Sequence, residues 1–104
     1  MIGIDLVNID DFRHQLEASG ESLIATTFNE DELTENGIEF LATLWAAKEA
    51  VVKAALDPPV NRKEIVLSLN ECGRLVARIG GHCFDLSLSN YGTYVVAVAM
   101  AIES

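Results

Sequence analysis

The chain of 104 residues has little positive charge: 7 Lys plus Arg stand against 16 Asp plus Glu, for a formal net charge of −9. This balance argues against general binding to nucleic acid or to anionic membranes, because phosphate groups need a cationic partner surface. Proline and cysteine are also scarce, at two residues each. Because half of the residues are apolar, we expect an ordered chain, with one domain over residues 1–104 and a core of its own.

Long apolar runs are lacking as well. The longest, residues 94–102, falls far short of the ~20 residues that a membrane-spanning helix needs. Met1 begins directly in a strand-like run, without a basic leader. Cys72 and Cys83 have no metal-ligand spacing and are expected to be free thiols. These features predict a cytoplasmic protein.

The acidic residues are concentrated at one end of the chain. Residues 1–39 contain ten acids and a single base, Arg13, whereas residues 40–104 contain six acids and six bases. An anionic ligand is therefore expected to bind the second part of the chain, where the positive charges lie.

Hydrophobic periodicity predicts helices in the first half of the chain. A strand over residues 1–7 is followed by a helix over 9–18, capped by Asn8, and by a shorter helix over 21–27, with Ser19–Gly20 between them. The strongest helix covers residues 39–56, which are rich in Ala and Leu and precede Asp57–Pro58–Pro59.

The second half alternates between apolar and polar residues. Strands are predicted at residues 65–70, 74–79, 83–89 and 93–102, joined by turns short enough for hairpins. The predicted fold class is therefore α+β: an N-terminal strand and helices, with one long helix packed on an antiparallel sheet.

The long helix carries a lysine among its large apolar side chains. At about 100° per residue, Phe40, Leu44 and Val51 share one arc with most other large apolar residues of the helix, and Lys48 lies at its middle. We expect the Lys48 ammonium to be buried beside a carboxylate or an anionic ligand, because an unpaired buried charge is costly. The alternative is a side chain whose stem crosses the apolar surface and leaves the ammonium in water. Ala42 and Ala46, on the side of the helix that carries Glu49 and Lys53, leave room for a close approach.

Glu49 and Lys53 lie one turn apart at the edge of the same arc. They form either a surface ion pair, worth only ~0.3–0.5 kcal/mol, or a site in which the carboxylate binds a hard cation and the ammonium binds phosphate. Asp5 would supply a second carboxylate, since an acid between Ile4 and Leu6 in a first strand is unusual; otherwise it faces solvent. One or two carboxylates plus substrate phosphates form the ligand set typical of Mg²⁺.

Several segments match one known family in order along the chain. Residues 3–7, GIDLV, match its G-I-D-x-V strand, and residues 28–33, FNEDEL, match its F-x-x-x-E-L turn. Residues 40–54, FLATLWAAKEAVVKA, correspond to its signature helix F-L-A-G-R-F-A-A-K-E-A-x-x-K-A. An N-x-x-G turn at 70–73 and a closing S-L-S segment with a tyrosine, at 87–94, complete the set. The chain therefore resembles the 4′-phosphopantetheinyl transferases of the small holo-acyl-carrier-protein synthase type.

The resemblance implies an enzyme of fatty acid or polyketide biosynthesis. It would transfer 4′-phosphopantetheine from coenzyme A to a serine of an acyl or peptidyl carrier protein, as a homotrimer with active sites between subunits. At matching positions, Asp5 and Glu49 would hold Mg²⁺ and act in catalysis together with Lys53, which would contact the coenzyme A phosphates. Further contacts to coenzyme A are implied for Lys48, Asn70, Gly73, Ser87, Ser89 and Asn90.

Three departures from the family remove positive charge. Leu44 stands where the signature helix has an arginine, and Asn90 stands where the closing segment has a histidine. The family's first helix is basic and docks an acidic carrier, whereas this one contains Asp10 and Asp11. Two functions are therefore open: a transferase acting on a less acidic carrier, or a catalytically weakened or inactive protein that serves as a binding or assembly module. The retained acids and lysines favour the transferase.

Overall fold

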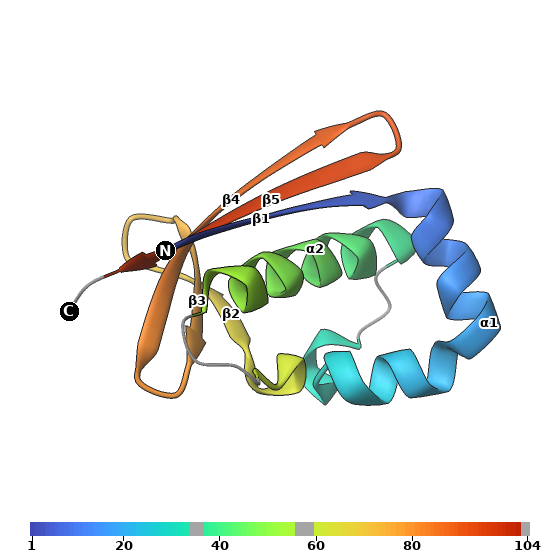
Figure 1. Ribbon diagram of the computed structural model, residues 1–104, viewed down its shortest axis with the longest axis horizontal. Coiled ribbons are helices and arrows are strands. Elements are labelled where there is room, and N and C mark those ends of the chain that lie inside the picture. Colours follow the sequence, from blue (N-terminus) through green and yellow to red (C-terminus); the bar gives the residue numbers. More distant parts are fainter. Residues whose placement is uncertain (34–36, 56–59, 103–104) are drawn as a thin grey trace.

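A long helix packed against one face of an antiparallel sheet forms the framework of the protein (Figure 1). The structure is a computed structural model that describes residues 1–33, 37–55 and 60–102. Its sheet has the strand order β1-β5-β4-β3-β2, and all neighbouring strands are antiparallel. The strands are β1 (Ile2–Asn8), β2 (Val66–Leu69), β3 (Leu75–Ile79), β4 (His82–Tyr91) and β5 (Tyr94–Ile102). The helices are α1 (Ile9–Thr27) and α2 (Ile38–Ala54), with short 3₁₀ turns η1 (Glu30–Glu32) and η2 (Arg62–Glu64). The predicted α+β class is confirmed.

The first helix begins and bends where the sequence predicts. The Asn8 side chain accepts hydrogen bonds from the backbone N–H groups of Asp10 and Asp11, at 2.9 and 3.1 Å, and so caps the helix. Ser19 has non-helical angles (φ −145°, ψ 38°) and divides α1 into two helical parts. The two predicted helices therefore exist, joined by a kink at Ser19.

The long helix is buried mainly through its alanines, which corrects the predicted arc. Alanines along α2 are fully or almost fully buried and face β1 and β5: Ala42, Ala46, Ala47, Ala50 and Ala54. Of the large apolar residues on the predicted arc, Val51 is fully buried and Phe40 is exposed; Leu41, Leu44, Trp45, Val52 and Ala55 are half-buried at the edge of the core. Alanines take the sheet side because only small side chains let the helix backbone lie close to the strands. The predicted helix end at Leu56 and the segment 57–59 lie outside the described residues.

Gly3 marks the closest approach between the sheet and the helix. A Cβ atom built on this residue would lie 2.0 Å from the Ala50 carbonyl oxygen and 2.6 Å from the Ala54 nitrogen. Real carbon atoms do not approach backbone atoms so closely, and only glycine fits this position of β1. The alanines of α2 and the glycine of β1 together set the separation of the two elements.

Three hairpins connect the four strands of the second half, as predicted. A positive φ at Gly73 (78°), Gly80 (57°) and Gly92 (59°) places a glycine at each turn, where other residues would be strained. The Asn70 side chain closes the first of these hairpins by accepting from the backbone N–H groups of Cys72 and Arg74.

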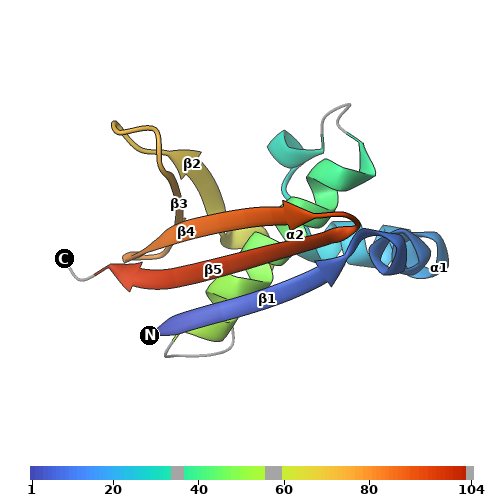
Figure 2. The same cartoon turned by 90° about the horizontal axis from the view of Figure 1, so that it is seen from above.

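One face of β1 and β5 is apolar and is not covered by any described element (Figure 2). We call it the outer face; its exposed residues are Ile2, Ile4, Leu6, Tyr94, Met100 and Ile102, which are between 42% and 60% exposed. Across the strands, Ile2 lies opposite Met100. Among the described helices, none has the length and apolar character needed to cross a membrane.

Candidate active site

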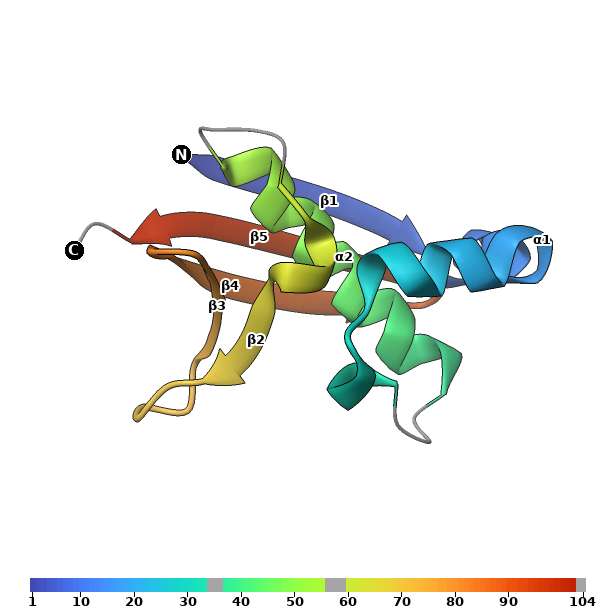
Figure 3. The same ribbon diagram turned by 90° about the horizontal axis from the view of Figure 1, so that it is seen from below.

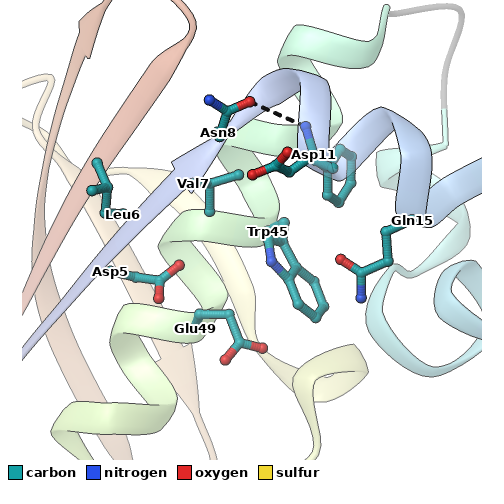
Figure 4. A pocket seen from close by; sticks show the side chains of 9 residues that line it. Asp5, Leu6, Val7, Asn8, Asp11, Gln15, Trp45 and Glu49 are labelled. Atoms are coloured by element: carbon teal, nitrogen blue, oxygen red, sulfur yellow. Dashed lines mark hydrogen bonds between the residues drawn. The ribbon is translucent and has the colours of Figure 1, made fainter.

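A pocket of about 290 Å³ opens where the end of β1 meets α1 and the middle of α2 (Figure 4). The strand contributes Asp5 on the same side as Gly3 and Val7, because alternate residues of a strand share a face. The helix contributes Glu49. In Figure 4 the two carboxylates extend from β1 and α2 toward the same space, with Trp45 beside them. Two acids 44 positions apart in the printed sequence are thus brought to one site.

Lys53 neutralises the first of these acids. Its Nζ atom lies 2.8 Å from Asp5 Oδ1 and also donates to the Ile4 carbonyl oxygen, at 3.2 Å. The Asp5 side chain is only 12% exposed, whereas that of Lys53 is 53% exposed. Asp5 therefore does not face solvent, and Lys53 presents a positive charge beside this carboxylate.

Arg62 neutralises the second acid and was missed by the sequence analysis. Its Nε and Nη2 atoms donate to the two carboxylate oxygens of Glu49, the second at 3.2 Å, and its guanidinium lies 5.8 Å from the centre of the Trp45 ring. The hydrogen bond to Glu49 raises the pKa of Arg62 above its usual value. Arg62 belongs to η2, and no periodic pattern in the sequence indicates that this turn lies against α2. The predicted alternative of a Glu49–Lys53 ion pair is wrong, because both residues have other partners.

The two carboxylates fit a magnesium ion whose remaining ligands are phosphate oxygens of a substrate and water. Over residues 1–33, 37–55 and 60–102, no cluster of three His, Cys, Asp or Glu side chains could hold a metal by itself. Mg²⁺ nevertheless needs only one or two carboxylates when phosphate oxygens and water complete its octahedral shell. Asp5 and Glu49 provide that number, and both line the pocket.

Lys48 is buried, as predicted, but away from this pocket. Its ammonium donates to Glu32 Oε1 at 2.7 Å and to the Thr27 carbonyl oxygen at 2.9 Å, and it lies 5.8 Å from the centre of the Phe28 ring. Burial lowers the pKa of Lys48, and the bond and charge of Glu32 oppose that effect. The alternative of an ammonium in water is therefore wrong. The Lys48–Glu32 ion pair joins α2 to the segment after α1. The glutamate of the F-x-x-x-E-L motif therefore holds this segment against the helix.

The remaining predicted coenzyme A contacts lie elsewhere in the chain. The Asn70 side chain is engaged in the β2–β3 turn, and Gly73 supplies the positive φ of that turn. Ser87 and Ser89 lie on β4 opposite Val98 and Val96. Both serines are exposed, as is Asn90 on the same strand. Within one chain, none of these residues lines the pocket.

Comparison with known proteins gives consistent matches over nearly the whole chain. The profile of the 4′-phosphopantetheinyl transferase superfamily matches residues 1–99. A holo-[acyl-carrier-protein] synthase of Mycobacterium sp. (strain KMS) is 32% identical, over 98% of this chain and 95% of that protein.

Solved structures agree with the sequence matches. The ACPS–CoA complex from Chronobacterium ammoniagenes is 29% identical, with a TM-score of 0.75 over 99% of this chain and 96% of that one. The Helicobacter pylori holo-[acyl-carrier-protein] synthase in complex with coenzyme A has the same fold, with a TM-score of 0.79 over 98% of this chain and 100% of that one, at 19% identity. The chain therefore belongs to the 4′-phosphopantetheinyl transferase superfamily and is of the holo-[acyl-carrier-protein] synthase type.

Proposed function

We propose that this protein transfers 4′-phosphopantetheine from coenzyme A to a serine of a carrier protein in a magnesium-dependent reaction. The observation that carries the proposal is the convergence of Asp5 and Glu49 on one pocket, with Lys53 paired to Asp5, in a chain whose relatives are holo-[acyl-carrier-protein] synthases. Phosphoryl transfer requires little covalent chemistry from a protein. It depends on the positioning of the reacting groups and on stabilisation of the negative charge on the phosphate oxygens.

The residues of the pocket have distinct parts in this reaction. Asp5 and Glu49 would hold Mg²⁺, which supplies charge neutralisation on the pyrophosphate. Lys53 would donate to a phosphate oxygen and stabilise the charge that develops there. The serine hydroxyl of the carrier would release its proton to water, and its oxygen would form a bond to the phosphorus as the bond to adenosine 3′,5′-bisphosphate breaks. Lys48 supports the site indirectly in this proposal, by fixing the helix that bears Glu49 and Lys53.

Mass spectrometry of a carrier protein tests this function. Incubation with coenzyme A, Mg²⁺ and the protein is expected to add the mass of one phosphopantetheinyl group to the carrier serine, and a carrier whose serine is replaced by alanine is the control. Chelation of the metal is expected to stop the reaction. A panel of acyl and peptidyl carriers that all remain unmodified would contradict the proposal and favour the alternative, a binding or assembly module weakened by Leu44 and Asn90.

The carrier is expected to be less acidic than usual for the family. Asp10, Asp11 and Glu17 are exposed on α1, and Asp11 lines the pocket that the carrier serine must reach. The one base of this helix, Arg13, is already paired with Asp10 at 2.8 Å. An acidic carrier would therefore be repelled at this helix. The proposed location is the cytoplasm, and both cysteines are free, as suits a reducing compartment.

We propose that copies of the chain associate through the outer face, as homotrimers. Exposed apolar patches of this kind are typical of interaction sites. Ser87 and Ser89 lie on the strand next to this face, so that association would bring them toward a neighbouring subunit, as expected for active sites between subunits.

Replacing Met100 with lysine is expected to convert the trimer into monomers, because a charge would be buried without a partner in the contact. Light scattering coupled to size-exclusion chromatography measures the mass. Leu69→Lys, which alters a more exposed apolar strand residue outside this face, is expected to leave the mass unchanged. A wild-type protein that is monomeric would contradict the proposed assembly.

A further inference from the structure

Arg62 is held in place by its own short turn, next to the pocket. The Asn61 side chain accepts from the Lys63 backbone N–H at 3.0 Å and caps η2, and Ile65 immediately after the turn is fully buried. Figure 3 shows η2 beside the second part of α1 and close to α2, in agreement with the contacts between these elements. The arginine is therefore anchored on the side of the helix that bears Glu49.

Arg62 contacts both Glu49 and Trp45 and is still partly exposed. Its guanidinium binds the Glu49 carboxylate at two points and lies over Trp45. The Arg62 side chain is 35% exposed, against 15% for Glu49, so it remains partly accessible to a ligand. A bidentate guanidinium suits phosphate oxygens as well as it suits a carboxylate.

The charges of the site are balanced only while each acid keeps its cation. Asp5 pairs with Lys53 and Glu49 pairs with Arg62, which makes the four groups neutral together. A divalent cation alone would leave these four groups with two excess positive charges, of which Asp11, the third acid of the pocket lining, would offset one. A divalent cation that arrives with a pyrophosphate diester, which bears one negative charge on each phosphate, would leave the four groups neutral. The arrangement therefore favours joint binding of metal and pyrophosphate.

We infer that Arg62 holds Glu49 as long as no metal is bound, and moves its two hydrogen bonds to the pyrophosphate of coenzyme A when a metal binds Glu49. The inference rests on the proposed function and adds a substrate-binding residue to it. It also supplies a cation that the signature helix lacks, since the residue at the family's arginine position is Leu44, a half-buried side chain packed against the core. The positive charge would come instead from the turn after α2.

Arg62→Gln separates the two roles by calorimetry, because they change affinity in opposite directions. Without the competing guanidinium, Mg²⁺ alone is expected to bind Glu49 more tightly. Coenzyme A in the presence of Mg²⁺ is expected to bind about 10- to 100-fold more weakly, as for the loss of hydrogen bonds to a charged group. Arg62→Lys keeps the charge but loses the two-pronged guanidinium. Its affinity for coenzyme A is expected to lie between those of the wild type and Arg62→Gln. Arg78→Gln removes the same charge from an exposed position of β3 and is expected to behave as wild type.

Trp45 offers a readout that does not depend on activity. It is the single tryptophan of the sequence, and Arg62 lies over its ring. Saturation with Mg²⁺ and coenzyme A is expected to shift the tryptophan emission of the wild type, and Arg62→Gln is expected to show a smaller change. Excitation at the red edge of the indole band avoids absorption by adenine.

Each possible result decides the inference. Dephospho-coenzyme A keeps the pyrophosphate but lacks the 3′-phosphate, and the same loss of affinity in Arg62→Gln is expected for it. A loss seen only with intact coenzyme A would overturn the assignment to the pyrophosphate. Equal weakening of Mg²⁺ and coenzyme A would indicate that Arg62 only maintains the turn. If the wild type modifies a carrier but Arg62→Gln binds coenzyme A normally, only the inference about Arg62 is overturned. If the wild type neither binds coenzyme A nor modifies a carrier, the proposed function is overturned as well.

Discussion

Replacing Glu49 with glutamine is expected to lower kcat/KM for carrier modification by about 10³-fold or more. The glutamine keeps the size of the side chain and a carbonyl oxygen for Arg62, but it removes one of the two anionic groups that would hold the metal. Asp5 alone, already paired with Lys53 at 2.8 Å, would bind Mg²⁺ weakly. Initial rates measured across a magnesium titration are expected to show little remaining dependence on the metal.

A binding measurement distinguishes this loss from damage to the fold. Coenzyme A with Mg²⁺ at about 100 times Kd stabilises a protein by about 2.7 kcal/mol, so the wild type is expected to melt at a clearly higher temperature when both are present. The Glu49→Gln variant is expected to show no such increase while keeping its own Tm in buffer near that of wild type. Glu64→Gln, the same change at an exposed residue of η2, serves as control. Full activity and an unchanged magnesium dependence in Glu49→Gln would refute the assignment of this residue.

Gly3→Ala is expected to cause the largest loss of stability of any small substitution in β1. The new methyl group would lie 2.0 Å from the Ala50 carbonyl oxygen and 2.6 Å from the Ala54 nitrogen. Because both atoms belong to the helix backbone, no side-chain rotation relieves the clash, and the whole helix must move away from the sheet. Overpacking typically costs 1–3 kcal/mol and sometimes more, and we expect a loss of about 3 kcal/mol, or a fall in Tm on the order of 15 °C.

Urea unfolding followed by circular dichroism measures this free energy. Gly20→Ala is the matched control, because the position of its Cβ has no neighbour within 4 Å apart from adjacent residues and the backbone of its own helix; it is expected to leave stability unchanged or slightly raised. The displaced helix would also carry Lys53 away from Asp5, so Gly3→Ala is expected to reduce binding of coenzyme A even where the variant remains folded. A loss below 1 kcal/mol would show that the helix adjusts more easily than its contacts suggest.

The secondary structure was largely predictable because its signals are local. The Asn8 cap, the break at Ser19, the alanine-rich helix and the strand alternation each depend on residues within a few positions of one another, and the structure confirms them. The orientation of α2 was predicted less well. Counting large apolar residues placed Phe40 on the buried side, whereas the alanines face the sheet, since the helix approaches β1 too closely for larger side chains.

The candidate site was predictable in its acids but not in its ion pairs. The resemblance to the family named Asp5 and Glu49, and both line the pocket. The burial of Lys48 followed from its place on the helix, but its partner Glu32 did not. Arg62 was missed entirely, because the path of the chain after α2 brings it to Glu49.

Composition, periodicity and motif order were sufficient to establish an acidic α+β chain of the 4′-phosphopantetheinyl transferase superfamily, since each of these depends on neighbouring residues or on residue identity. The pairing of charges needed the folded chain. Lys53 meets an acid 48 positions earlier rather than the glutamate one turn away on its own helix, and Arg62 reaches that glutamate from another element. Ion pairs depend on distance in space, and only the packing of α2 against β1, made close by Gly3 and the alanines, determined which charges meet.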